Sequence, residues 1–200
     1  MTTAIWRCET KLLITGHIFL IICGAFYLAW WCYAFYPGYR GSRVTGIAGI
    51  LLLITAITGL AGVSATIMGI MEKGTREPFI PGTFILFGSV SLYILLLIIS
   101  SRLLHRQVTT ELLLIILWTA LEISSYQSAY CAERIEAGMM WFLIILIGVC
   151  AVISLYFYLQ FYRVNADRGY VYGMIPLILV EICMVIFLFS GILRRILFHG

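Results

Sequence analysis

Residues 112–130, LLLIILWTALEISSYQSAY, decide the fold of this chain. The stretch contains no Lys, Arg or Asp and has about the 20 residues that a helix needs to cross a bilayer. One carboxylate, Glu122, lies near its centre, where an ionisable group is most expensive in lipid. The stretch therefore predicts a membrane-spanning helix that carries a candidate functional residue.

Five further runs have the same character. They cover residues 12–35, 44–71, 79–100, 139–162 and 172–193. Backbone groups in hydrocarbon must be satisfied within a helix or a closed barrel, and the alternating pattern of barrel strands is absent. We predict an all-α integral membrane protein, a bundle of six transmembrane helices that forms a single domain over residues 1–200.

The composition supports lipid as the solvent. Hydrophobic residues make up 62% of the 200 residues and charged residues 11%, too apolar a balance for a water-soluble core of this size. The net charge of +4 is ordinary for contact with acidic head groups, and nucleic acid is not an expected partner. Six cysteines include no C-x-x-C pair, so we expect neither a metal nor a cofactor.

The loops leave the orientation open. Seven Lys and Arg residues fall on the side that carries both predicted termini and six on the other, so the positive-inside rule does not decide. Glu9, Glu72, Glu77, Glu133 and Glu136 all fall on the terminal side, and we favour a cell-membrane protein with both termini outside. If that side faces an oxidising compartment, a disulfide between Cys8 and Cys131 is one hypothesis, and two free thiols are the alternative.

Two short similarities suggest an internal repeat. Thr10-Lys11-Leu12-Leu13 opens the first span and Thr110-Glu111-Leu112-Leu113 the fourth, while residues 103–105 and 197–199 close the third and sixth. Two three-helix halves would be inverted relative to each other, a plan common in transporters. Chance similarity between Leu-rich segments is the alternative.

A polar and aromatic stripe accompanies Glu122. At 100° per residue its helix face is shared by Trp118, Ser125, Tyr126 and Ala129, with Glu111 three turns earlier. Desolvation favours the protonated carboxyl, so the stripe fits a proton-linked or cation-binding site. The alternative is a neutral Glu122 that hydrogen-bonds a neighbouring helix.

Two other spans contain ionisable residues. Glu181 lies at a similar depth in the sixth span, and a proton shared between Glu122 and Glu181 is one hypothesis. His17 lies in the first span, with Gly24 and Trp31 at seven-residue steps, and is a candidate proton relay or ligand residue. A packing role is the alternative for His17.

The second span is rich in small residues. Thr55, Gly59, Gly62 and Thr66 share one face, which lets a neighbouring backbone approach closely. We expect this helix to lie centrally and to use the face for helix packing.

These observations favour a transporter or permease-like protein with a midplane protonatable cavity for a small solute or ion. The catalytic patterns H-E-x-x-H, G-x-S-x-G and the P-loop are absent, so catalytic residues are not assigned. One alternative is a membrane enzyme that acts on a lipid or quinone-like substrate. The other is a non-catalytic bundle that forms a homo-oligomer or binds a partner subunit.

Overall fold

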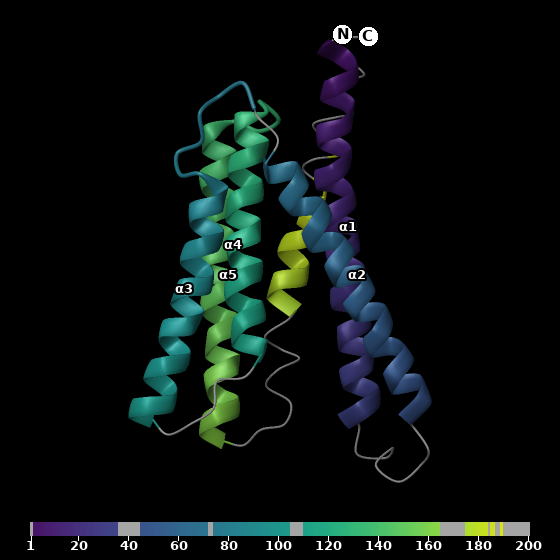
Figure 1. Ribbon diagram of the computed structural model, residues 1–200, viewed down its shortest axis with the longest axis vertical. Helices are drawn as coiled ribbons and strands as arrows, with labels where there is room; N and C mark the ends of the chain where they lie inside the picture. The colour runs from purple at the N-terminus through teal and green to yellow at the C-terminus, as the bar shows by residue number, and fades with distance from the viewer. Residues whose placement is uncertain are drawn as a thin grey trace. The chain divides into compact units, whose positions relative to one another are not determined.

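The computed structural model describes residues 2–35, 45–71, 74–104, 110–164, 175–183, 185–186 and 189. These residues are almost entirely helical and include no strand (Figure 1). The long helices are α1 Thr2–Phe35, α2 Thr45–Met71, α3 Gly82–Ile99, α4 Thr110–Cys131 and α5 Ala137–Val164. A π-helical turn, η1 Ser100–Leu104, continues α3, and residues 175–183 form a further helical segment. The prediction of an all-α chain is confirmed for the described residues.

Five of these helices are long and apolar enough to cross a membrane. The candidate spans are Lys11–Trp30, Gly46–Met71, Gly82–Arg102, Leu112–Cys131 and Ala137–Gln160, and each overlaps one of the first five predicted spans. Large apolar side chains such as Leu60 and Phe87 are 71% and 76% exposed, which is favourable in lipid and unfavourable in water. Of the predicted sixth span, 172–193, only the helical residues named above are described. The count of six helices therefore stays a prediction.

The chain divides into two compact units, and each is described by itself. The first unit contains Met1–Gly69 and Ile178–Gly200, and the second contains Ile70–Leu177. The predicted inverted repeat stays a prediction, because its second pair of similar segments includes His105 and residues 197–199, which lie outside the described residues. The side chain of Cys8, the other cysteine of the hypothesised disulfide, also lies outside the described residues. Cys131 carries a free thiol.

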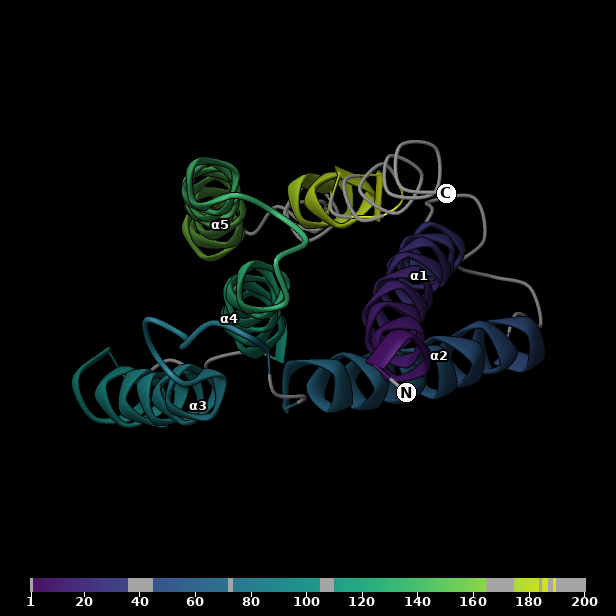
Figure 2. The ribbon, with the colours of Figure 1, turned by 90° about the horizontal axis from the view of Figure 1, so that it is seen from above.

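In the first unit, α1 and α2 lie side by side and touch through small residues (Figures 1 and 2). A Cβ added to Gly16 would lie 2.8 Å from the backbone nitrogen of Thr66, and one added to Gly62 would lie 3.0 Å from the backbone nitrogen of Leu20. One added to Gly69 would lie 2.8 Å from Cγ of Leu13. The absence of side chains at these positions lets the two backbones approach closely.

The expectation that the second span is central stays a prediction, because it depends on parts of the chain beyond the first unit. On α2, Leu53 is 60%, Ile57 58% and Leu60 71% exposed, and among the described residues of the first unit the close approach is made by the glycine face towards α1. A face of small residues requires only one close neighbour, and the remaining apolar faces suit lipid equally well.

In the second unit, α4 lies between α3 and α5 and packs against both (Figure 2). This position explains why α4 is richest in buried side chains. Its buried residues include polar ones that an exposed lipid face would not tolerate: Glu122, Ser124, Ser125 and Gln127.

Candidate functional site

The first unit contains a buried pair of ionisable side chains. Nδ1 of His17 and Oε2 of Glu181 are 2.5 Å apart, and both side chains are 0% exposed. The two residues are 164 positions apart in the sequence, so the tertiary fold alone brings them together. Both were named as candidates from the sequence, although their partnership with each other was not expected.

Helical periodicity places the two side chains. On α1, the residues at positions 13, 16, 17, 20 and 24 are buried at steps of three and four, which defines one continuous inner face. Gly16 occupies the part of that face against α2, and His17 follows it by 100° around the helix towards Glu181. Residues 177, 180 and 181 are buried with the same spacing on the segment that carries Glu181.

The geometry of the pair fits one shared proton. Either a protonated carboxyl donates to a neutral imidazole, or an imidazolium donates to a carboxylate, and both arrangements have zero net charge. Removing this proton or adding a second would leave a net charge in a buried site, which is costly unless another charge arrives. The pair is therefore chemically suited to exchanging a proton when a charged or polar species enters its surroundings.

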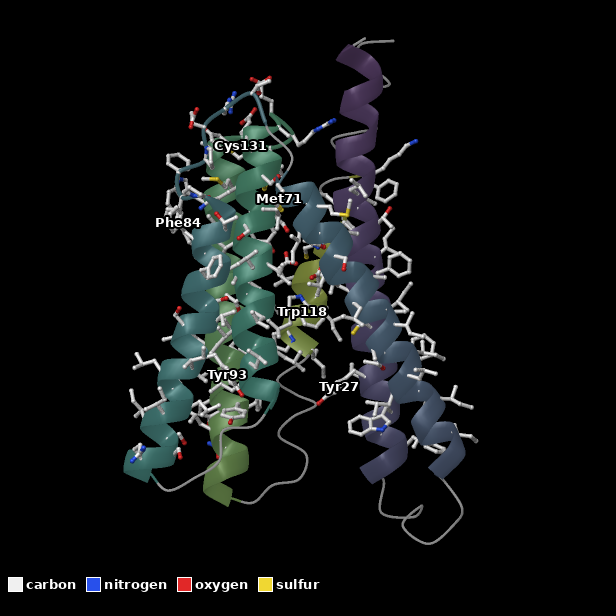
Figure 3. The ribbon with its side chains drawn as sticks, viewed as in Figure 1. Tyr27, Met71, Phe84, Tyr93, Trp118 and Cys131 are labelled. Carbon is white, nitrogen blue, oxygen red and sulfur yellow. The ribbon has the colours of Figure 1, made fainter. Side chains whose placement is uncertain are left out.

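The stripe predicted around Glu122 is buried on α4 of the second unit. Glu122, Ser125, Tyr126 and Ala129 are each 0% exposed, and Trp118 is 6% exposed. Figure 3 labels Trp118 within α4 and Cys131 at the end of the helix. The side chain of Glu111 lies outside the described residues. The predicted partnership of Glu122 with Glu181 stays a prediction.

The predicted packing residues lie on the face of α2 described above. Gly59 faces Sγ of Cys23, and Gly62 and Thr66 face Leu20 and Gly16. Thr55 is 9% exposed, and its hydroxyl donates to the carbonyl oxygen of Leu51 at 2.9 Å. This bond to the preceding turn satisfies the hydroxyl within α2.

Two hollows in the second unit were not expected from the sequence. An apolar groove of about 410 Å³ is lined by α3, α4 and α5, and a polar pocket of about 440 Å³ lies beside the end of α4. Four residues of α4 line the polar pocket at spacings of three, four and seven: Ser124, Gln127, Ser128 and Cys131. This second stripe is visible in the sequence, although nothing there indicates that residues 70–71, 74–78 and 81–83 form the opposite wall.

Comparison with protein families, curated proteins and solved structures gives no match to this chain. The fold and the site define only a class. The described part of the chain is helical, with five helices suited to crossing a membrane and a buried carboxylate–imidazole pair.

Proposed function

We propose that the protein is a small multi-pass transporter or permease of the cell membrane, in which proton exchange at buried carboxylates is coupled to the movement of a small solute or ion. The observation that carries this proposal is the His17–Glu181 pair, with a 2.5 Å contact and no exposed side-chain surface. Ionisable residues within membrane spans are rare, and those that persist commonly mark ion pathways and proton relays.

The reason for coupling is electrostatic. A pair that holds one proton is neutral, and loss of that proton leaves a negative charge in a medium of low dielectric constant. A cation, or a solute with a cationic group, stabilises that charged state, so its binding and proton release favour each other. Within this proposal, Glu122 is a second protonatable group and Trp118, Ser125 and Tyr126 line its surroundings.

The remaining elements of the proposal concern architecture. The helical segment 175–183 belongs to a sixth membrane span, which places both termini on one side of the membrane. The inverted three-helix repeat and the placement of the termini outside the cell are part of the same proposal.

The experiment uses purified full-length protein in liposomes that contain the pH dye pyranine. A panel of amino acids, sugars, organic cations and monovalent metal ions is added outside, and the change in internal pH is recorded. We expect at least one member to drive a proton flux in the wild type and Glu181→Gln to abolish it, because an amide does not titrate. Glu136→Gln, the same change at an exposed position, is the matched control and retains the flux.

Two results would contradict the proposal. One is a wild-type protein for which no solute moves protons, and the other is a folded Glu181→Gln variant with an unchanged flux. Gel filtration and thermal unfolding in detergent establish that each variant is folded before it is reconstituted.

The apolar groove favours a second candidate function, the binding of a lipid-like molecule. Its lining consists almost entirely of apolar side chains of α3, α4 and α5. The hydroxyls of Ser89 and Thr119 also line it, but each donates to a carbonyl of its own helix at 2.7 Å, to Leu86 and Ile115. Because these hydroxyls already have acceptors, the groove fits the binding of an acyl or prenyl chain better than chemistry on it.

A further inference from the structure

The polar pocket of the second unit is enclosed by segments that are distant in sequence. One wall is the Ser124, Gln127, Ser128 and Cys131 face of α4, and the other comprises the end of α2, residues 74–78 and the start of α3. Met71 and Cys131, labelled in Figure 3, both line it. Its volume of about 440 Å³ falls within the range of small-molecule sites.

Backbone contacts fix the loop wall against α4. The hydroxyl of Thr75 and the backbone N–H of Arg76 both donate to the carbonyl oxygen of Cys131, each at 3.1 Å. A Cβ added to Gly74 would lie 2.5 Å from that same carbonyl group, so only glycine fits there. The backbone N–H of Ile80 donates to Oε1 of Gln127 at 3.4 Å, and the Gln127 side chain lines the pocket.

The start of α3 brings backbone donors to the pocket. Pro81 is the N-cap residue and supplies no side-chain cap, and its carbonyl oxygen accepts from the N–H groups of Phe84 and Ile85 at 2.9 and 3.3 Å. Gly82 and Thr83 line the pocket, and their N–H groups have no acceptor among the described residues. Unpaired N–H groups and the helix dipole together make a helix start attractive to an anionic group.

Ser124 provides an independent indication of a ligand. It lines the pocket, is 1% exposed, and its Oγ has no hydrogen-bond partner in the described part of the chain. A Cβ added to Gly82 would lie 3.6 Å from this Oγ, so the hydroxyl lies beside the start of α3. A buried hydroxyl without a partner is destabilising, and a ligand oxygen between Ser124 and the Gly82 N–H would satisfy both.

The pocket also carries one charge of each sign, on Arg76 and Glu77. Nε of Arg76 lies 3.7 Å from Oε1 of Glu133, and the guanidinium carbon lies 4.9 Å from the centroid of the Tyr130 ring. These contacts orient the guanidinium through Nε and its face, so the two Nη groups remain as donors. A ligand that complements the lining therefore has an anionic and a cationic end.

We propose that this pocket binds a compact zwitterion. Its anionic end lies at the start of α3, against Ser124 and Arg76, and its ammonium group lies towards Glu77. Free α-amino acids and the phosphoethanolamine head group of a lipid share this chemistry. The proposal does not depend on proton-coupled transport, because its residues all lie in the second unit and its test is binding alone.

The test measures binding to the purified full-length protein in detergent by isothermal titration calorimetry. The zwitterionic probes are L-serine, L-glutamine and phosphoethanolamine. Acetate and ethylammonium serve as ligands that carry only the negative or only the positive charge. In a lipid arm, native mass spectrometry compares retention of phosphatidylethanolamine and phosphatidylglycerol from equimolar vesicles. Binding of a free probe identifies a solute site, and selective retention of phosphatidylethanolamine identifies a head-group site.

Variants connect either result to the pocket. We expect Ser124→Ala to weaken binding about tenfold, as loss of a hydrogen bond to a charged ligand does. Glu77→Gln, at an exposed position, should weaken the binding of zwitterions and leave the binding of acetate unchanged. Ser154→Ala removes a buried hydroxyl of α5 that lines neither hollow and should leave affinity unchanged. The proposal is overturned if no zwitterion or lipid binds selectively, if acetate binds as tightly, or if Ser154→Ala weakens binding as much as Ser124→Ala.

Discussion

At the scale of single residues, the His17–Glu181 pair is the feature of the first unit that we expect to be most sensitive to substitution. Each side chain is fully buried and the two are in contact, so each contributes to compensating the proton and charge of the other. An imidazole or a carboxyl that loses this contact keeps its desolvation penalty.

We predict strongly non-additive stabilities for leucine variants of this pair. His17→Leu and Glu181→Leu should each lower the free energy of unfolding by about 3–5 kcal/mol, because each removes the contact that the buried polar partner makes within the pair. The double variant should lose less than either single variant, since both polar groups are gone. Reversible unfolding in mixed micelles measures the cycle, and additive losses would show that the pair does not interact in the folded protein.

The chemistry of single residues also explains why the candidate site could be predicted only in part from the sequence. Glu122, Glu181 and His17 stand out in the sequence because ionisable groups inside apolar runs are costly wherever they lie. Which of them meet depends on helix packing across 164 positions, and hydropathy does not specify that packing. Ser124 was overlooked because serine is unremarkable in an apolar helix until its lack of a partner is seen.

At the scale of elements, apolar length predicted the helices and local stereochemistry set their ends. The third span was predicted from Phe79, yet α3 begins at Gly82, because Pro81 disfavours helical geometry in the residue before it. The C-terminal end of α4 is capped by residues that follow Cys131. Glu133 has a φ of 55°, and the N–H of Arg134 donates to the carbonyl oxygen of Ala129 at 2.8 Å. Glycine is the usual residue in that left-handed position, so a cap formed with Glu133 could not be predicted from residue type.

The contact between α1 and α2 yields a prediction at this scale. Gly16→Ala should destabilise the protein by about 1–3 kcal/mol, because its Cβ would meet the Thr66 backbone and the two helices would have to separate. Gly49→Ala on α2 is the matched control, since nothing lies within 4 Å of an added Cβ there. Thermal unfolding in one detergent compares the two, and equal midpoints would show that the close approach does not exist.

At the scale of the whole molecule, composition alone established a helical chain suited to a membrane. It did not reveal the two compact units, because contacts such as that between Glu181 and His17 on α1 have no local signature in the sequence. The predicted division into halves of three helices follows the order of the sequence, whereas the first unit combines segments from the two ends of the chain and the second is continuous.

Counting the spans gives the corresponding prediction. Six crossings place both ends of the chain on the same side of the membrane, whereas the five spans found among the described residues would place them on opposite sides. Cysteine reporters added at each end of a cysteine-free variant and labelled with an impermeant maleimide on intact cells distinguish the two. Equal labelling of both ends is expected, and labelling of one end alone would exclude the sixth span.

The attachment of residues 74–80 to α4 has a consequence for biosynthesis. Thr75, Arg76 and Ile80 bond to Cys131 and Gln127, which leave the ribosome some fifty residues later. Before α4 is synthesised, these groups therefore lack the acceptors that they have in the folded protein, and the loop adopts its final shape only when α4 is present. The α3–α4 hairpin, rather than either helix alone, is thus the smallest unit whose insertion completes this part of the protein.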